Sequence, residues 1–112
     1  MTTQHHDLTT VIDRYFDLAA APDPEPFFAQ FADDAVVEDD GGRHDGIAAV
    51  RAWRTSVPAV SYRVRSVAPT DAGGRAVAEI SGDFPGSPVD LAFTFALDGT
   101  IIRALTIAPV PE

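Results

Sequence analysis

Residues 89–107 alternate apolar and polar side chains on both sides of a tight turn at Asp98-Gly99. Before the turn, the apolar positions are Val89, Leu91, Phe93, Phe95 and Leu97. A period of two places every second side chain on one face, which is typical of a half-buried strand, and Asp-Gly is a strong hairpin signal. The sequence therefore predicts two antiparallel strands, the second running from Ile101 to Ile107.

The preceding segment carries the same signature. Val60, Tyr62 and Val64 alternate with polar residues, and so do Ala76, Ala78, Ile80 and Phe84. Residues 71–74 (DAGG) and 85–88 (PGSP) have the composition of a hairpin loop and a turn. The second half of the chain is thus predicted to be a run of antiparallel strands.

The first half has a helical period. One face of a helix is marked by the spacing of Leu8, Val11, Ile12, Tyr15, Phe16 and Ala19, and Pro22 is expected to end that helix. Asp23 and Pro24 favour the start of a short second helix that contains Phe27, Phe28 and Phe31 and stops by residues 33–34.

A brief strand and a third helix are predicted next. Residues 35–39 (AVVED) are too few for a helix and include β-branched residues, so we expect a strand followed by a turn at residues 40–42. Asp45 is expected to cap a helix whose apolar positions are Ile47, Val50, Trp53 and Val57, ended by Pro58. Helices followed by strands predict an α+β fold, with the helices on one face of a curved antiparallel sheet. A chain of 112 residues fits a single domain over residues 1–112.

Composition excludes several classes of function. The net charge is −9, all 8 basic residues are arginine, and there is no cysteine. An acidic chain lacks the basic face that nucleic acids or anionic membranes require. Schiff-base chemistry and phosphate-binding loops need lysine, and thiol chemistry needs cysteine. The N-terminal residues do not resemble a signal peptide, and no apolar stretch is long enough for a membrane span, so we expect a cytoplasmic protein.

Two segments carry a family resemblance. The run VIDRYFDLAAAPDPEPFFAQFADDAVVEDDGGRHDGIAAVRAW and the ending FTFALDGTIIRAL resemble the nuclear transport factor 2-like superfamily, nearest to its ketosteroid isomerase and SnoaL-like polyketide cyclase branches. The resemblance covers about residues 8–108. It implies a cone-shaped fold with three N-terminal helices closed over a bent antiparallel sheet, and a deep apolar pocket. It also implies a small enzyme without a cofactor that transfers a proton next to a carbonyl of a hydrophobic substrate.

The resemblance assigns the general base to Asp39, at the end of the first strand. Strand parity agrees, because Ala35, Val37 and Asp39 share one face and Glu38 lies on the other. An apolar surrounding disfavours the ionised form of a carboxylate and strengthens it as a base. The alternative is that Asp39, like the other acidic residues of this cluster, is a solvated turn residue.

Other site residues are expected from the same resemblance. Tyr15 matches a tyrosine that donates a hydrogen bond to a developing oxyanion; alternatively, it is a core aromatic. A second donor, an aspartate, is replaced by Leu91, whereas Asp90 has the opposite parity. Arg54, near the position where the isomerases have a further tyrosine, could pair with Asp39, hold an anionic or carbonyl oxygen of a ligand, or lie exposed on the third helix. Pocket-lining residues are further predicted at Val37, Trp53 and three aromatic positions: Phe16, Phe31 and Phe93.

Metal and cofactor sites are not expected. His5 and His6 lack a third ligand at suitable spacing. His44 is expected to be a solvated loop residue near the mouth of the pocket; the alternative is that it shuttles a proton there. No nucleotide-binding or metal-hydrolase motif occurs. The expected partner is a small hydrophobic molecule. A non-catalytic binding module of the same fold is the alternative, favoured by Leu91.

A homodimer is also predicted. Within the last strand, Ile101, Arg103, Leu105 and Ile107 share one side. The resemblance implies that this side lies on the convex face of the sheet, where its three large aliphatic residues would be exposed in a monomer. An exposed apolar patch of this kind usually marks an interface. Arg63 or Arg65 would then pair with acidic residues across its rim.

Overall fold

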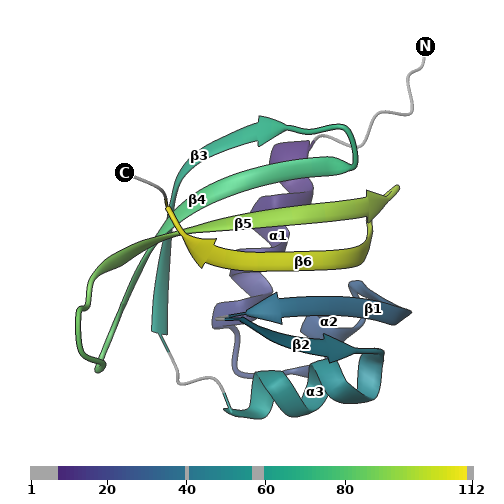
Figure 1. The fold of residues 1–112 in the computed structure, drawn as a ribbon, viewed down its shortest axis with the longest axis horizontal. Helices are drawn as coiled ribbons and strands as arrows, with labels where there is room; N and C mark the ends of the chain where they lie inside the picture. The colour runs from purple at the N-terminus through teal and green to yellow at the C-terminus, as the bar shows by residue number, and fades with distance from the viewer. Residues whose placement is uncertain (1–7, 40, 57–59, 111–112) are drawn as a thin grey trace.

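The computed structural model describes residues 8–39, 41–56 and 60–110 (Figure 1). The helices are α1 (Leu8–Ala20), α2 (Glu25–Phe28) and α3 (Ile47–Ser56). The strands are β1 (Phe31–Asp39), β2 (Gly42–Asp45), β3 (Val60–Pro69), β4 (Gly73–Gly82), β5 (Val89–Asp98) and β6 (Ile101–Pro109). The predicted α+β class is confirmed. Five residues named in the predictions lie outside the described residues: His5, His6, Asp40, Val57 and Pro58.

The strands form one sheet in the order β2-β1-β6-β5-β4-β3. The three predicted hairpin connections from β3 to β6 are antiparallel, as expected. The fully antiparallel sheet is wrong, however, because β1 pairs with β6 in parallel. Turn residues in the sequence indicate pairing only between strands that follow one another along the chain. Strands β1 and β6 are far apart in the sequence, so no turn signal could indicate their parallel pairing. Residues 42–45, predicted as turn and cap, form strand β2 on the outer edge of β1.

The helices differ from the three N-terminal helices that the resemblance implies. Helix α1 buries the four central residues of its predicted stripe and partly buries Leu8 and Ala19, and Pro22 lies just after its end. Helix α2 is a single turn, since Phe31 already begins β1 and pairs with Ile102. Helix α3 follows the β1–β2 hairpin, so the third helix comes after two strands.

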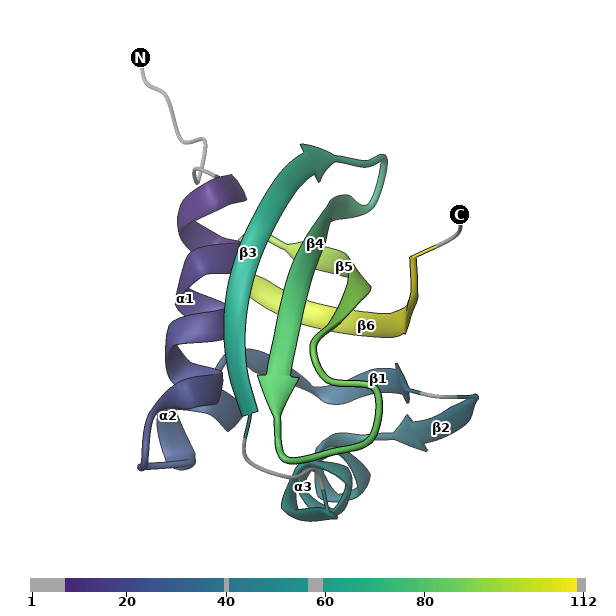
Figure 2. The ribbon, with the colours of Figure 1, turned by 90° about the vertical axis from the view of Figure 1, so that its left-hand side faces the viewer.

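The start of helix α3 also differs from the prediction. Val50 N donates to the carbonyl of Gly46, whereas the carboxylate of Asp45 binds Arg43 and does not cap the helix. Figure 2 shows α1 running alongside β3, with α3 beside the β1–β2 hairpin.

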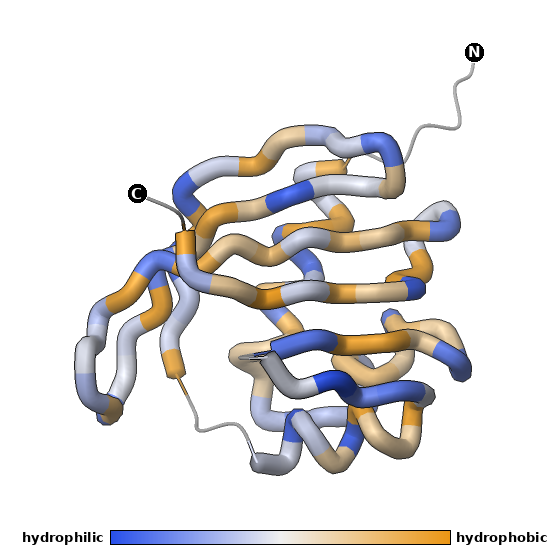
Figure 3. The backbone as a smooth tube through the Cα atoms, viewed as in Figure 1, coloured by the Kyte–Doolittle hydropathy of each residue, from blue (hydrophilic) through white to orange (hydrophobic). Residues whose placement is uncertain are grey.

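The core lies between the helices and the concave face of the sheet. Figure 3 shows hydrophobic positions recurring along β5 and β6. Tyr15 is at the centre of this core. Its ring contacts four phenylalanine rings at centroid distances of 5.0 to 6.2 Å: those of Phe16, Phe27, Phe93 and Phe95. Edge-to-face and tilted packing of this kind adds to the free energy gained by burial. These contacts fix α1 against β5, which positions one wall of the pocket described below.

The patch on which the homodimer prediction depends is not present. Ala96 and Leu97 pair with Ala104 and Ile102, so Arg103 is an extra residue on β6 that reverses the parity of the strand. Leu105 is consequently 1% exposed and Ile107 9%, whereas Ile101 is 38% exposed. The predicted rim arginines are engaged within the chain: Arg63 and Arg65 pair with Glu79, and Arg65 also with Asp90. The homodimer itself stays a prediction, to be checked by light scattering.

Close approach of the backbones requires glycine at position 73. A Cβ there would lie 2.5 Å from the carbonyl oxygen of Phe95, which is part of the neighbouring strand and cannot move freely. We expect Gly73→Ala to lower the free energy of unfolding by about 1–3 kcal/mol. Gly42→Ala is the matched control, because its Cβ would meet nothing closer than 3.4 Å. Urea unfolding would measure both, and equal stability of the two variants would contradict the close packing.

Candidate functional site

An open pocket of about 480 Å³ lies between the helices and the concave face of the sheet. Its wall consists largely of apolar side chains, together with four that carry a hydroxyl or a charged group: Tyr15, Asp39, Arg54 and Tyr62. The remaining lining residues are Trp53, Val60, Ile80, Phe84, Val89, Leu91, Phe93, Ile107, Ala108 and Pro109. A concave apolar site with a few polar groups is typical of small-molecule binding.

Asp39 is the carboxylate of this pocket. It is the last residue of β1, it is partly buried, and its Oδ2 accepts a hydrogen bond of 2.9 Å from the indole Nε1–H of Trp53 on α3. The predicted parity holds, since Ala35 and Val37 on the same face are fully buried. Because Trp53 engages one carboxylate oxygen, it fixes the orientation of Asp39 and leaves Oδ1 for a ligand.

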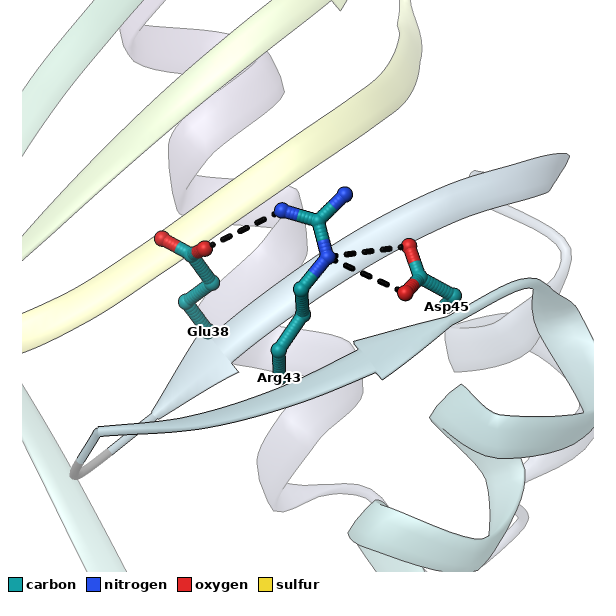
Figure 4. Close-up of polar contacts among 3 residues, drawn as sticks. All are labelled: Glu38, Arg43 and Asp45. Carbon is teal, nitrogen blue, oxygen red and sulfur yellow. Dashed lines mark hydrogen bonds and ion pairs between the residues drawn. The ribbon is translucent and has the colours of Figure 1, made fainter.

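The neighbouring acidic residue faces away from the pocket. Glu38 pairs with Arg43 at 3.3 Å on the outer side of the β1–β2 hairpin, and Arg43 also binds Asp45 at 3.0 Å (Figure 4). The predicted outward orientation of Glu38 is therefore confirmed. The three side chains are substantially exposed, so this cluster is a surface ion network and does not belong to the pocket.

Tyr15 lines the pocket from helix α1. It is 1% exposed, and burial raises the pKa of its hydroxyl far above the ordinary value; Arg54 lowers this pKa, whereas Tyr62 and Asp39 raise it. The hydroxyl thus keeps its proton at neutral pH. None of the described residues forms a hydrogen bond with this hydroxyl. Every fully buried polar side-chain atom in this part of the chain has a partner, so the unbonded hydroxyl is accessible from the pocket that Tyr15 lines. Its O–H is available to donate to a ligand oxygen.

Arg54 does not pair with Asp39, which resolves one of the alternatives left by the sequence. Its Nη2 donates to the carbonyl of Ala19 at 2.9 Å and to the hydroxyl of Tyr62 at 3.1 Å. Its guanidinium also lies 4.7 Å from the ring centroid of Phe27. Arg54 therefore ties helix α3 to the C-terminal end of α1 and to β3, while still lining the pocket.

The other predicted site residues divide into two groups. Trp53, Leu91 and Phe93 line the pocket, and Asp90 points away and pairs with Arg65, as its parity predicted. Phe16, Phe31 and Val37 do not line it; they are buried core residues. His44 lies on strand β2 and not in a loop, with its ring 6.2 Å from that of Trp53.

Tyr62 is the polar lining residue that sequence reasoning missed. Its position in the alternation of Val60, Tyr62 and Val64 predicted a buried face, but nothing in that pattern indicated a pocket. Its hydroxyl accepts a hydrogen bond from Arg54 on helix α3, and the alternation of residues within strand β3 cannot indicate a contact with another element.

Neither a metal site nor a membrane-spanning helix is found among the described residues. No group of three or more histidine, aspartate or glutamate side chains among them is placed to bind a metal ion. No helix in this part of the chain is long and apolar enough to cross a membrane.

A family model, the SnoaL-like domain, matches residues 12–103 of the sequence. The chain belongs to the SnoaL-like family. No curated protein matches this SnoaL-like chain. Its fold is that of the nuclear transport factor 2-like superfamily, as the resemblance implied.

Solved structures agree with this assignment. The SnoaL-like chain is 30% identical to a proposed polyketide cyclase from Sinorhizobium meliloti, with a TM-score of 0.82 over 91% of this chain and 99% of that one. A protein from Catenulispora acidiphila with a ketosteroid isomerase-like fold, solved with trimethylamine, is 16% identical, with a TM-score of 0.74 over 87% and 82%. A nuclear transport factor 2-like protein of unknown function from Cytophaga hutchinsonii is 12% identical, with a TM-score of 0.77 over 99% and 96%. The last two show the fold alone.

Proposed function

We propose that this SnoaL-like protein is a small enzyme that needs no cofactor and transfers a proton next to a carbonyl of a hydrophobic substrate. One observation carries the proposal: Asp39 and Tyr15 line the same apolar pocket. Asp39 supplies a carboxylate oxygen as base, and Tyr15 supplies a hydroxyl that keeps its proton as hydrogen-bond donor. The similarity to a proposed polyketide cyclase supports the same class of reaction.

The chemistry requires both groups in one step. Asp39 accepts a proton from the carbon beside the carbonyl, and the electron pair of that C–H bond moves onto the carbonyl oxygen as an enolate. Tyr15 donates a hydrogen bond to this oxygen, whose charge grows as the bond breaks. Return of the proton to another carbon completes an isomerisation, and attack of the enolate carbon on a second carbonyl completes a cyclisation.

A binding module without catalysis is the second candidate. Leu91 supports it, because this residue lines the pocket at the position where the isomerases place a second oxyanion donor. One oxyanion donor is typically worth a factor of about 100 to 1000 in rate. A pocket with Tyr15 alone would therefore stabilise an enolate less well than one with two donors.

Proton exchange into ketones distinguishes the two candidates. The protein would be incubated in D2O with cyclic aryl ketones such as 1-tetralone, with and without a carboxylate substituent, and deuterium incorporation beside the carbonyl followed by NMR. We expect the wild-type protein to accelerate exchange in at least one of them. Saturable binding of these ketones without any accelerated exchange would contradict the enzyme and support the binding module.

Tyr15→Phe tests the hydrogen-bond donor. Phenylalanine keeps the ring contacts with Phe16 and Phe95 but removes the hydroxyl. We expect the exchange rate to fall about 100-fold, with a thermal unfolding temperature close to that of the wild type. An unchanged exchange rate in the folded variant would show that Tyr15 is only a core aromatic.

A further inference from the structure

Among the described residues, Arg54, the cation of the pocket, has only neutral partners. Arg54 bonds to the carbonyl of Ala19 and the hydroxyl of Tyr62, and it appears in none of the ion pairs formed by the described residues. A partly buried charge is usually paired with an opposite charge, because solvation by water is reduced there. The missing counter-charge indicates what the pocket is built to receive.

The guanidinium retains donors for that purpose. Both hydrogen bonds that Arg54 donates to the described part of the chain use Nη2, so Nε and Nη1 make none there. One face of the group is covered by Phe27, and Trp53 lies 5.9 Å away. The side chain is therefore held by several contacts while two of its nitrogens remain unused. A preorganised guanidinium with free N–H groups is suited to a carboxylate.

The pocket also keeps its two opposite charges apart. The indole N–H of Trp53 donates a hydrogen bond to Asp39, and the guanidinium of Arg54 lies 5.9 Å from the centroid of the same indole ring. Asp39 and Arg54 nevertheless form no ion pair with each other. An apolar lining connects the two groups. A ligand between them would place its reacting C–H at the carboxylate and an acidic substituent at the guanidinium.

We propose that the pocket takes hydrophobic molecules that carry one carboxylate, with Arg54 binding that carboxylate. This assignment of the substrate class rests on the proposed function, because it concerns the same pocket. The protein has a net charge of −9, so its overall field opposes the approach of anions. The preference for an anion must come from the local guanidinium.

Two isosteric probes measure this preference. Adamantane-1-carboxylate and adamantane-1-carboxamide have the same apolar body and differ in charge. The chain contains one tryptophan, Trp53, whose fluorescence reports occupancy of the pocket that it lines. We expect the wild type to bind the carboxylate at least about tenfold more tightly than the carboxamide. Equal affinities, or tighter binding of the carboxamide, would overturn the proposal.

Two matched variants test whether Arg54 is the source of the preference for the carboxylate probe. Arg54→Gln is expected to reduce it to less than about twofold. Arg14→Gln is the control, since it removes the same charge from an exposed position on α1 and should keep the preference. A preference retained in a folded Arg54→Gln variant would overturn the role of Arg54.

A measurement on the wild type keeps the test independent of variant stability. The Nε–H signal of Arg54 in a ¹⁵N spectrum should shift on titration with the carboxylate but not with the carboxamide. An Arg54 signal that does not respond to the carboxylate would overturn the proposal. Asp39→Asn separates this proposal from proton transfer, because we expect it to lose ketone exchange while keeping the carboxylate preference.

Discussion

Asp39→Asn should lower the rate of ketone proton exchange by a factor of about 100 to 10,000, the usual contribution of a general base. Asparagine has nearly the same shape, and its amide oxygen can still accept the hydrogen bond from Trp53 Nε1 that holds Asp39 in place. The change therefore removes the basic oxygen and leaves the pocket wall intact. Deuterium incorporation under identical conditions would measure the effect.

Asp33→Asn is the matched control for this experiment. Asp33 lies on the same strand, β1, but it is exposed and does not line the pocket. Its replacement changes the net charge equally and should leave exchange unchanged. If both variants exchanged as fast as the wild type, Asp39 would not be the base.

Leu105→Glu should unfold much of the protein, whereas Ile101→Glu should be tolerated. Leu105 is 1% exposed, and a carboxylate there would be buried without a partner, which we expect to cost about 4 kcal/mol or more. Ile101 is 38% exposed, so the same change there should stay within about 1 kcal/mol. Urea unfolding followed by circular dichroism would measure both.

The pair of variants tests the bulge in β6 directly. A regular strand would put residues 101 and 105 on one face, and the two changes would then have similar effects. The extra residue Arg103 moves Leu105 to the core side instead. Similar stabilities of the two variants would contradict the observed register.

Local patterns predicted the elements that depend on local rules. The apolar stripe of α1 and the alternation along β5 needed only the periods of a helix and a strand, and both are confirmed. The bulge at Arg103 has no periodic signal in the sequence. It arises because the adjacent residues Ala96 and Leu97 on β5 pair with Ala104 and Ile102, which leaves Arg103 without a partner in the register. Phe31 has helical spacing from Phe27 and Phe28, but its pairing with Ile102 at the far end of the sequence places it in a strand.

The sequence predicted the two central residues of the site but not the contacts of Arg54. Strand parity and the family resemblance together indicated Asp39, and the resemblance indicated Tyr15; both line the pocket. The partners of Arg54 lie on α1 and β3, so its hydrogen bonds depend on tertiary packing that no spacing reports. Phe16 and Phe31 were expected in the pocket because aromatic residues suit either a core or a cavity, and only the packing distinguishes the two.

Proton transfer by Asp39 requires that a ketone bind in the pocket beside this carboxylate, and the indole N–H of Trp53 reports on that binding. The single tryptophan gives one indole signal in a ¹⁵N spectrum, and this N–H donates to Asp39. Titration of the wild type with 1-tetralone should shift that signal to saturation. An unmoved indole signal, with shifts instead at the amides of Ala96 and Ala104, which line a second hollow, would contradict this mode of binding.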